Sequence, residues 1–191
     1  MKIENPEIKK EYFDRIDDRI LKMDEFIKSM LDFSRANRLD LKNEVINFSD
    51  VITSSITDLE YLEGFEDFKI IENYNGNLKR VKMDKLRLSI IFSNLISNAF
   101  KYRNRKMKLS FLKINVSYTN RLLLIVFEDN GIGIAKKYLN NVFDMFFRAT
   151  EKSDGSGLGM YIVKQAIDKL NGTVTIDSKL KVGTTVTIKI P

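Results

Sequence analysis

The spacing of the apolar residues changes near residue 45 of this 191-residue chain, and this change limits the folds that it can adopt. Before it, apolar residues recur every three or four positions, which predicts one long helix from Ile8 to about Phe33 with a broad apolar face. Such a face must be buried against the following domain, a second copy or another segment, and we expect a partner helix. The polar stretch from Ser34 to Glu44 should end the helix and form a linker. The apolar stripe consists of Ile8, Tyr12, Ile16, Ile20, Met23, Ile27 and Met30, widened by Phe13, Leu21, Phe26, Leu31 and Phe33.

After residue 45 the pattern mixes helical and strand signals without a regular β-α-β alternation. This mixture predicts an α/β fold, a two-layer sandwich in which helices cover one face of a mixed, mostly antiparallel sheet. We expect helices over residues 51–62, capped by Ser49 and Asp50, over 84–102 and over 157–170, and a short one over 136–142. We expect strands in hairpins over 69–74 with 78–83 around Asn75-Gly76, over 108–119 with 120–129, and over 173–178 with 184–190.

The composition excludes several classes of protein. The chain has no cysteine and no histidine, so disulfides and thiolate metal sites are impossible and a zinc site would need carboxylates alone. The longest apolar run, Leu122 to Phe127, is too short to span a membrane, and the first residues carry no signal segment, so we expect a soluble chain. The net charge is +6, but acidic residues are interleaved with the basic ones, which disfavours a nucleic-acid partner.

A glycine-rich stretch, Asp154 to Ile162, leads directly into a helical pattern. Its spacing fits neither a P-loop nor a dinucleotide fingerprint. A glycine loop at the start of a helix presents free N–H groups and the positive end of the helix dipole, which favour an anion. The alternative is a flexible connection in which the glycines only permit a turn.

Two other stretches carry polar groups suited to a ligand. Asn94 and Asn98 lie four residues apart on one helix face, with Lys101 following, although both amides could equally face solvent or cap a loop. The apolar strand ending at Asp129 runs into a glycine-rich turn, so its carboxylate could accept a hydrogen bond from a bound amine. An ordinary tight turn is the alternative there.

Taken in order, five motifs resemble the ATP-binding domain of sensor histidine kinases, in the GHKL group that includes DNA gyrase B, Hsp90 and MutL. They are SNLISNAFKY, EDNGIGI, VFDMFFR, DGSGLGMYI and VGTTVTIKIP, which resemble the N box, first glycine box, F box, second glycine box and closing strand of that domain. The resemblance implies the Bergerat fold over residues 46–191. MLDFSR resembles the end of the second helix of the family's dimerisation hairpin, which implies that residues 1–45 are a partial dimerisation helix and linker.

The resemblance also implies a role for each matching residue. Asn98 would be the Mg²⁺ ligand, Asn94 and Lys101 would act as catalytic residues beside the phosphates, and Tyr102 would flank the nucleotide. Asp129 would accept a hydrogen bond from the adenine amino group, with Thr184 supporting it through water. The remaining nucleotide-binding positions would be Gly131, Gly133, Ile134, Phe147, Gly155, Gly157, Leu158 and Gly159. Phe143, Phe146 and Phe147 would be lid or docking aromatics, although packing explains at least one of them. Arg148 could reach the γ-phosphate or the partner domain, and an ordinary surface arginine is the alternative.

The family's phosphate acceptor is a histidine, and this chain has none. In the water-splitting members a Glu stands four residues before the Mg²⁺ ligand, but here that position is Asn94, which favours transfer to a protein side chain. The resemblance therefore implies the ATP-binding catalytic part of a two-component histidine kinase, with ATP or ADP and Mg²⁺ as ligands. Its partners would be a response-regulator receiver domain and a second copy in the full-length parent.

The missing histidine leaves alternatives open. A chain cut between the two hairpin helices is the economical explanation, and any membrane anchor of the parent would then lie in segments upstream of this cytoplasmic portion. An acceptor-less nucleotide-sensing scaffold, an anti-sigma-type serine kinase and a non-enzymatic dimerisation module are the others, although the long helix speaks against the serine kinase. We expect no acid-labile phosphoprotein when this chain alone meets radiolabelled ATP, and we expect self-association through residues 8–33 or docking of that helix onto the domain.

Overall fold

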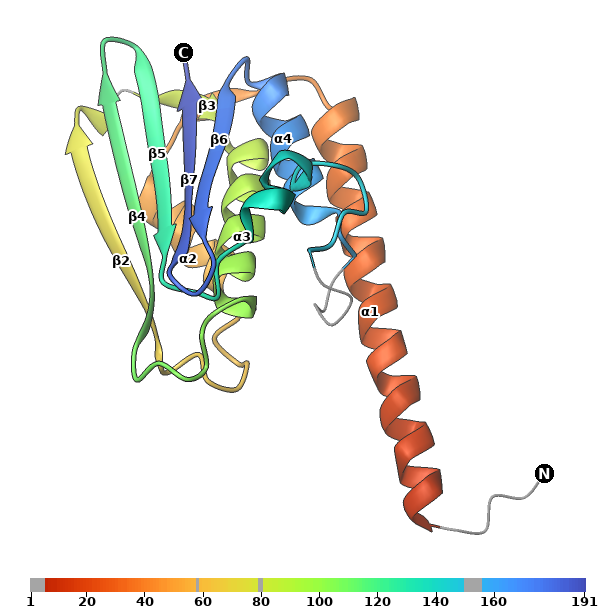
Figure 1. Cartoon of the computed structure of the whole chain (residues 1–191). Helices are drawn as coiled ribbons and strands as arrows, with labels where there is room; N and C mark the ends of the chain where they lie inside the picture. Colours follow the sequence, from red (N-terminus) through yellow and green to blue (C-terminus); the bar gives the residue numbers. More distant parts are fainter. Residues whose placement is uncertain (1–5, 58, 79–80, 150–155) are drawn as a thin grey trace.

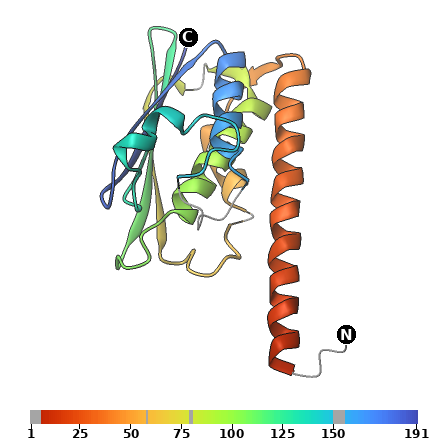
Figure 2. The same ribbon diagram turned by 45° about the vertical axis from the view of Figure 1, so that its right-hand side comes forward.

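A long helix, α1 (Pro6–Arg38), lies beside an α/β sandwich in the computed structural model, which describes residues 6–57, 59–78, 81–149 and 156–191 (Figure 1). Turned by 45°, the structure shows three layers: the sheet, then the helices that cover it, then α1 on the outside (Figure 2). The sheet with helices on one face confirms the predicted fold class.

The main sheet has five strands in the order β2-β4-β5-β7-β6. The pair β2 and β4 is parallel, and the other three pairs are antiparallel. In β4 and β5, buried residues alternate with partly exposed ones, because the helices cover one face of the sheet and the other faces solvent. The strands are β2 (Phe68–Gly76), β4 (Ser110–Thr119), β5 (Leu122–Asp129), β6 (Thr173–Lys179) and β7 (Gly183–Ile190).

Three helices pack their apolar sides onto the sheet, and a short 3₁₀ helix, η2 (Lys136–Asn141), lies between β5 and α4. The longest of the three ends at Lys101, and Phe92 on it contacts Phe127 of β5 edge to face, with ring centroids 5.0 Å apart. The last helix ends at Lys169 and is closed by a Schellman motif. Asn171 has φ 56°, and the backbone N–H groups of Asn171 and Gly172 donate to the carbonyl oxygens of Asp168 and Ile167. The helices are α2 (Phe48–Ile56), α3 (Lys85–Lys101) and α4 (Gly159–Lys169).

The predicted hairpin around Asn75-Gly76 is wrong. Residues 75 and 76 continue β2, which pairs in parallel with β4, and α3 is the crossover between them. Gly76 has φ +84°, and a Cβ there would lie 2.3 Å from the carbonyl oxygen of Tyr118 in β4, so this glycine permits close strand approach instead of a turn. The other strand of the supposed hairpin is β3 (Lys82–Asp84), which pairs with β1 (Asn43–Val45).

Two other boundaries also differ from the sequence predictions. The second helix starts at Phe48 and ends at Ile56, so Ser49 and Asp50 lie in its first turn and do not cap it. The stretch expected to form a linker is partly ordered, because α1 continues to Arg38 and residues 43–45 form β1. The hairpins over β4 with β5 and β6 with β7 are confirmed.

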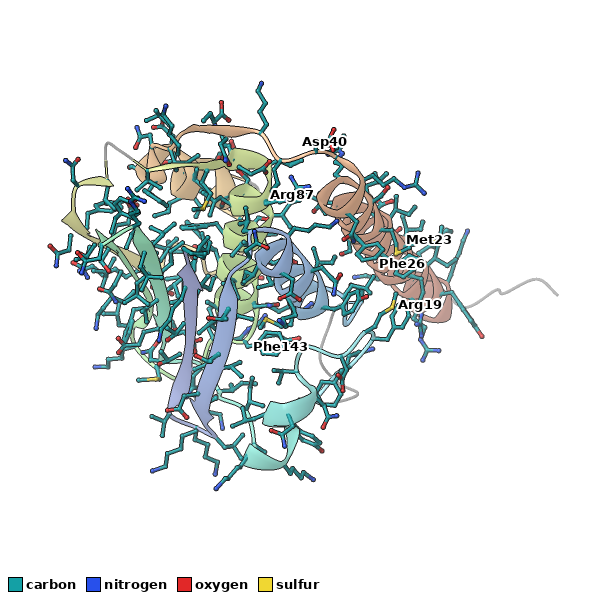
Figure 3. All side chains as sticks on the ribbon, turned by 90° about the horizontal axis from the view of Figure 1, so that it is seen from above. Arg19, Met23, Phe26, Asp40, Arg87 and Phe143 are labelled. Atoms are coloured by element: carbon teal, nitrogen blue, oxygen red, sulfur yellow. The ribbon has the colours of Figure 1, made fainter. Side chains whose placement is uncertain are left out.

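A buried ion pair joins the start of α3 to the segment that follows α1. Asp84 caps α3 by accepting a hydrogen bond from the Arg87 backbone N–H at 2.8 Å, and the same carboxylate pairs with the Arg87 guanidinium at 2.9 Å. The backbone N–H of Lys42 donates to Asp84 at 2.8 Å, and the Arg87 guanidinium donates to the carbonyl oxygen of Leu39. Figure 3 shows Arg87 between α3 and α1, with Asp40 at the end of α1.

The N-terminal part of α1 extends beyond the sandwich (Figure 1). Only its last turns pack against α4 and α3, where the ring of Phe33 lies 5.8 Å from that of Tyr161. In the described part of the chain, no helix has both the length and the apolar character needed to cross a bilayer. The side chains of Ile8 and Leu21 lie outside the described residues, and the exposed apolar residues of α1 are Tyr12, Phe13, Ile16, Ile20, Met23, Phe26, Ile27, Met30 and Leu31.

Candidate functional site

A mostly apolar cavity of about 230 Å³ lies between α3 and the sheet. Asp129, at the end of β5, supplies a carboxylate to its lining, and Tyr102 lies at the end of α3. An apolar cavity with one ionisable acceptor suits a flat, largely apolar ring that carries an amino group. The rest of the lining includes Leu95, Ala99, Leu112, Phe127, Ile134, Met160, Ile176 and Val186.

Asp129 is held in place by backbone groups on two sides. Its carboxylate accepts a hydrogen bond from the Gly131 backbone N–H at 2.8 Å and another from the backbone of Thr184, its neighbour on β7. Burial raises the pKa of Asp129, and the two backbone hydrogen bonds partly oppose this rise. The Thr184 hydroxyl, which the sequence predicts to support Asp129 through water, lies 2.9 Å from the hydroxyl of Ser178.

The turn after β5 brings the backbone close to this cavity. A Cβ at Gly131 would lie 2.6 Å from the carbonyl oxygen of Tyr102, and at Gly133, where φ is +66°, it would lie 2.1 Å from that of Lys179. The next residue, Ile134, donates its backbone N–H to the Ser178 hydroxyl at 2.8 Å. The two glycines therefore allow a tight turn that fixes one wall of the cavity.

A second, more polar cavity of about 330 Å³ adjoins the first, and Asn98, Tyr102, Val142, Phe147 and Met160 line both. It is also lined by Asn94, Lys101, Gly157 and Gly159.

The polar cavity includes the start of α4. A Cβ at Gly159 would lie 2.8 Å from Oδ1 of Asn94, so the first residue of α4 abuts the two amides of α3. Free N–H groups at a helix start, together with amides and an ammonium, suit an anion with several oxygens. The Asn94 side chain also donates to the carbonyl oxygen of Ile90 at 2.8 Å.

The aromatic and basic residues between η2 and α4 differ in whether they line one of the two cavities. Phe147 is partly buried against Tyr138, with ring centroids 5.8 Å apart, and Arg148 lines the apolar cavity. Phe146 is 54% exposed and has φ 63°, and it does not line either cavity. Phe143, labelled in Figure 3, also lines neither cavity. Gly155 lies outside the described residues, and Leu158 is buried in a cluster with Ile90 and Ile162 and lines neither cavity.

The metal chemistry of the site is limited by its donors. Among the described residues, no three His, Cys, Asp or Glu side chains are grouped closely enough to hold a metal ion. A cation here would need oxygen from the ligand itself, together with an amide such as that of Asn98. This donor set fits Mg²⁺, which keeps several waters and binds through one or two protein oxygens and substrate phosphates.

Sequence reasoning missed several residues at the site: Ser178 supports the lining residues Ile134 and Thr184 through hydrogen bonds, and three residues of α1 line the polar cavity. Ser178 could have been found from the register of the β6–β7 hairpin, which places it opposite Thr184. Lys28, Ser29 and Asp32 of α1 also line the polar cavity, and nothing in their spacing distinguishes them from a solvated helix face.

Comparisons with known proteins agree with this geometry. The family model described as "Histidine kinase-, DNA gyrase B-, and HSP90-like ATPase" matches residues 83–191. Sensor histidine kinase WalK of Bacillus subtilis (strain 168) is 37% identical over 115 residues, which are 58% of this chain and 19% of WalK. Sensor protein RprX of Bacteroides fragilis (strain YCH46) is 32% identical over 169 residues, 85% of this chain and 31% of RprX. This chain thus spans less than a third of either relative.

Solved structures share the fold. The crystal structure of full-length ShkA in complex with AMPPNP has a TM-score of 0.72 and 21% identity, covering 91% of this chain and 36% of ShkA. The Acinetobacter baumannii histidine kinase AdeS has a TM-score of 0.71 and 22% identity, covering 93% of this chain and 82% of AdeS.

Proposed function

Because this chain belongs to the histidine kinase-, DNA gyrase B- and HSP90-like ATPase family, we propose that its two adjoining cavities bind ATP with Mg²⁺. The adenine ring occupies the apolar cavity and the phosphates occupy the polar one. The observation that carries this assignment is the position of Asp129, whose fixed carboxylate lines the apolar cavity and can accept a hydrogen bond from the adenine amino group.

The residues of α3 then act at the junction. Asn98 lines both cavities and holds Mg²⁺, while Asn94 and Lys101 line only the polar cavity and face the phosphates. Mg²⁺, when bound, neutralises the charge that develops on the phosphate oxygens. Tyr102 flanks the nucleotide, and the ammonium of Lys101 lies 5.9 Å from the centre of its ring.

We propose that the reaction is transfer of the γ-phosphoryl group to a histidine outside this chain, as in a two-component sensor kinase. The relatives' names support this class, and the amide at Asn94 supports transfer to a side chain because a water-activating Glu would occupy that position in the hydrolysing members. The apolar face of α1 pairs with a second copy, and a response-regulator receiver domain takes the phosphoryl group onward. Residues 1–45 and 46–191 are the proposed dimerisation and catalytic parts.

A nucleotide-sensing scaffold is the second candidate, because this chain contains no histidine. It would bind nucleotide in the same cavities without transferring phosphate. Both readings agree in expecting no acid-labile phosphoprotein from this chain alone with radiolabelled ATP, so a labelled band would contradict both.

The test is a calorimetric titration with ATP and ADP, with and without Mg²⁺, on the wild type and on Asp129→Ala. Wild-type binding should be saturable, and Asp129→Ala should lose most of it because the adenine amino group then has no acceptor. Asp177→Ala, an exposed aspartate on β6, is the matched control and should bind like the wild type. Equal binding by Asp129→Ala and the wild type would refute the assigned adenine site.

A further inference from the structure

The polar cavity is closed on one side by α1. Lys28, Ser29 and Asp32 line it together with Asn94 and Lys101. Residues 28 and 32 are four apart and residues 29 and 32 are three apart, so all three side chains belong to one face of the helix. The long helix is therefore part of the proposed phosphate site.

Two contacts near the end of α1, one within the helix at Phe33 and one just beyond it at Leu39, fix this face of α1 in place. Phe33, which is next to Asp32, packs against the buried cluster of Ile90, Leu158 and Ile162, and its ring stacks near Tyr161. Six residues further on, the carbonyl oxygen of Leu39 accepts a hydrogen bond from buried Arg87. Because α3 and α4 also carry the amides and glycines of the cavity, these contacts hold α1 at a defined position relative to the phosphates.

The charges of the lining favour an anion. Among the described lining residues, Lys28 and Lys101 are cations and Asp32 is the carboxylate. Asp32 is half-buried, and burial raises its pKa, while the nearby charges of Lys28 and Arg35 oppose this rise. A triphosphate carries several negative charges, so Lys28 would attract it and Asp32 would repel it.

We infer that Lys28 of α1 binds the terminal phosphate of the nucleotide, so that the long helix contributes a phosphate-binding residue to the site. This inference rests on the proposed function. Lys28 is exposed and carries a flexible stem, which lets its ammonium follow the γ-phosphate, the group that distinguishes ATP from ADP. Asp32, one turn along the same face, opposes phosphate binding when Mg²⁺ is absent.

The experiment measures the affinities of ATP, ADP and adenosine for the wild type, Lys28→Ala, Lys28→Arg and Asp32→Asn by calorimetry. Lys28→Ala should lower ATP affinity roughly tenfold, lower ADP affinity less and leave adenosine unchanged, because one charge-assisted contact to phosphate is lost. Lys28→Arg should retain most of the ATP affinity. Asp32→Asn should raise ATP affinity in the absence of Mg²⁺ by about threefold, since a nearby repulsive charge is removed. Lys10→Ala changes an exposed lysine near the start of α1, so it is the control and should have no effect on these affinities.

ATP affinity should fall in Lys28→Ala and rise in Asp32→Asn. A merely structural role of these residues would instead lower ATP affinity in both variants. Wild-type ATP affinity in Lys28→Ala, with normal adenosine binding, would overturn this inference alone. An equal loss of ATP and adenosine binding in Lys28→Ala would also overturn it, because the cavity itself would then be disturbed. Failure of the wild type to bind ATP, ADP or adenosine would overturn the proposed function and this inference together.

Discussion

The buried pair of Asp84 and Arg87 makes a strong prediction about stability. Their side chains are 3% and 1% exposed, and Arg87 Nε has no hydrogen-bond partner among the described residues, so the guanidinium depends on Asp84 and on the Leu39 carbonyl oxygen. Asp84→Ala would leave this charge buried without its counter-ion, at a cost of about 4 kcal/mol, and would remove the α3 N-cap at about 1 kcal/mol. We therefore expect the free energy of unfolding to fall by about 5 kcal/mol.

Two further variants test whether the uncompensated charge is the cause. Arg87→Met should cost less, about 2 kcal/mol, because Asp84 keeps its hydrogen bonds from the backbone N–H groups of residues 87 and 42. Asp84→Ser combined with Arg87→Met should also cost less than Asp84→Ala alone, since serine retains the cap and no buried charge remains.

The assay is urea unfolding followed by circular dichroism, with Lys85→Ala, an exposed neighbour on α3, as the control. Small domains have a total stability of about 5–15 kcal/mol, so Asp84→Ala should lose most or all of its folded population, whereas Arg87→Met remains measurable. A cost of only about 1 kcal/mol for Asp84→Ala would refute the reasoning, because losing the cap alone would explain it.

Three other predictions follow from single features of the structure. Because the pKa of Asp129 is raised, its carboxylate takes up a proton at a pH above 3.8, the ordinary pKa of aspartate. On acidification, adenosine affinity should therefore fall as the acceptor is lost, whereas the free energy of unfolding of the ligand-free domain should rise. Calorimetry measures the affinity across the pH range, and urea unfolding measures the stability. Gly133→Ala should cost at least about 2 kcal/mol in urea unfolding, and more than Gly64→Ala, whose Cβ would meet only the flexible Arg103 side chain. The wild type should sediment as a dimer or larger species, and Ile16→Ser with Ile20→Ser should make it monomeric, because both side chains are exposed on α1; a monomeric wild type would contradict this.

The sequence was most informative where the pattern is local. Periodicity located α3 and α4, because apolar residues at helical spacing report burial on one face. The strands β4 and β5 were located as a hairpin in which β5 is a short continuous apolar run. The hairpin at Asn75-Gly76 was mispredicted because the same dipeptide serves a turn or a close strand contact. Only the distant partner, Tyr118 on β4, decides between these uses.

The residues of the candidate site also differ in whether a local pattern or a distant contact determines their position. Asp129 ends one strand and the turn follows it directly, so their position beside each other was predictable from a short motif. The placement of Lys28 and Asp32 at the polar cavity depends on how α1 packs onto α4, where Phe33 contacts Tyr161. No local pattern in α1 encodes that contact.

The placement of Asp129 on β5 affects which part of the site opens most easily. This strand is paired on both sides, with β4 and with β7, so its amide hydrogens should be among the slowest to exchange with solvent. The polar cavity is lined in part by Ser156, Gly157 and the first residue of α4, and the backbone at a helix end generally opens at a lower free energy than a central strand. The site thus has a gradient of local stability, and a bound nucleotide should remain held by its base while its phosphate end samples open states.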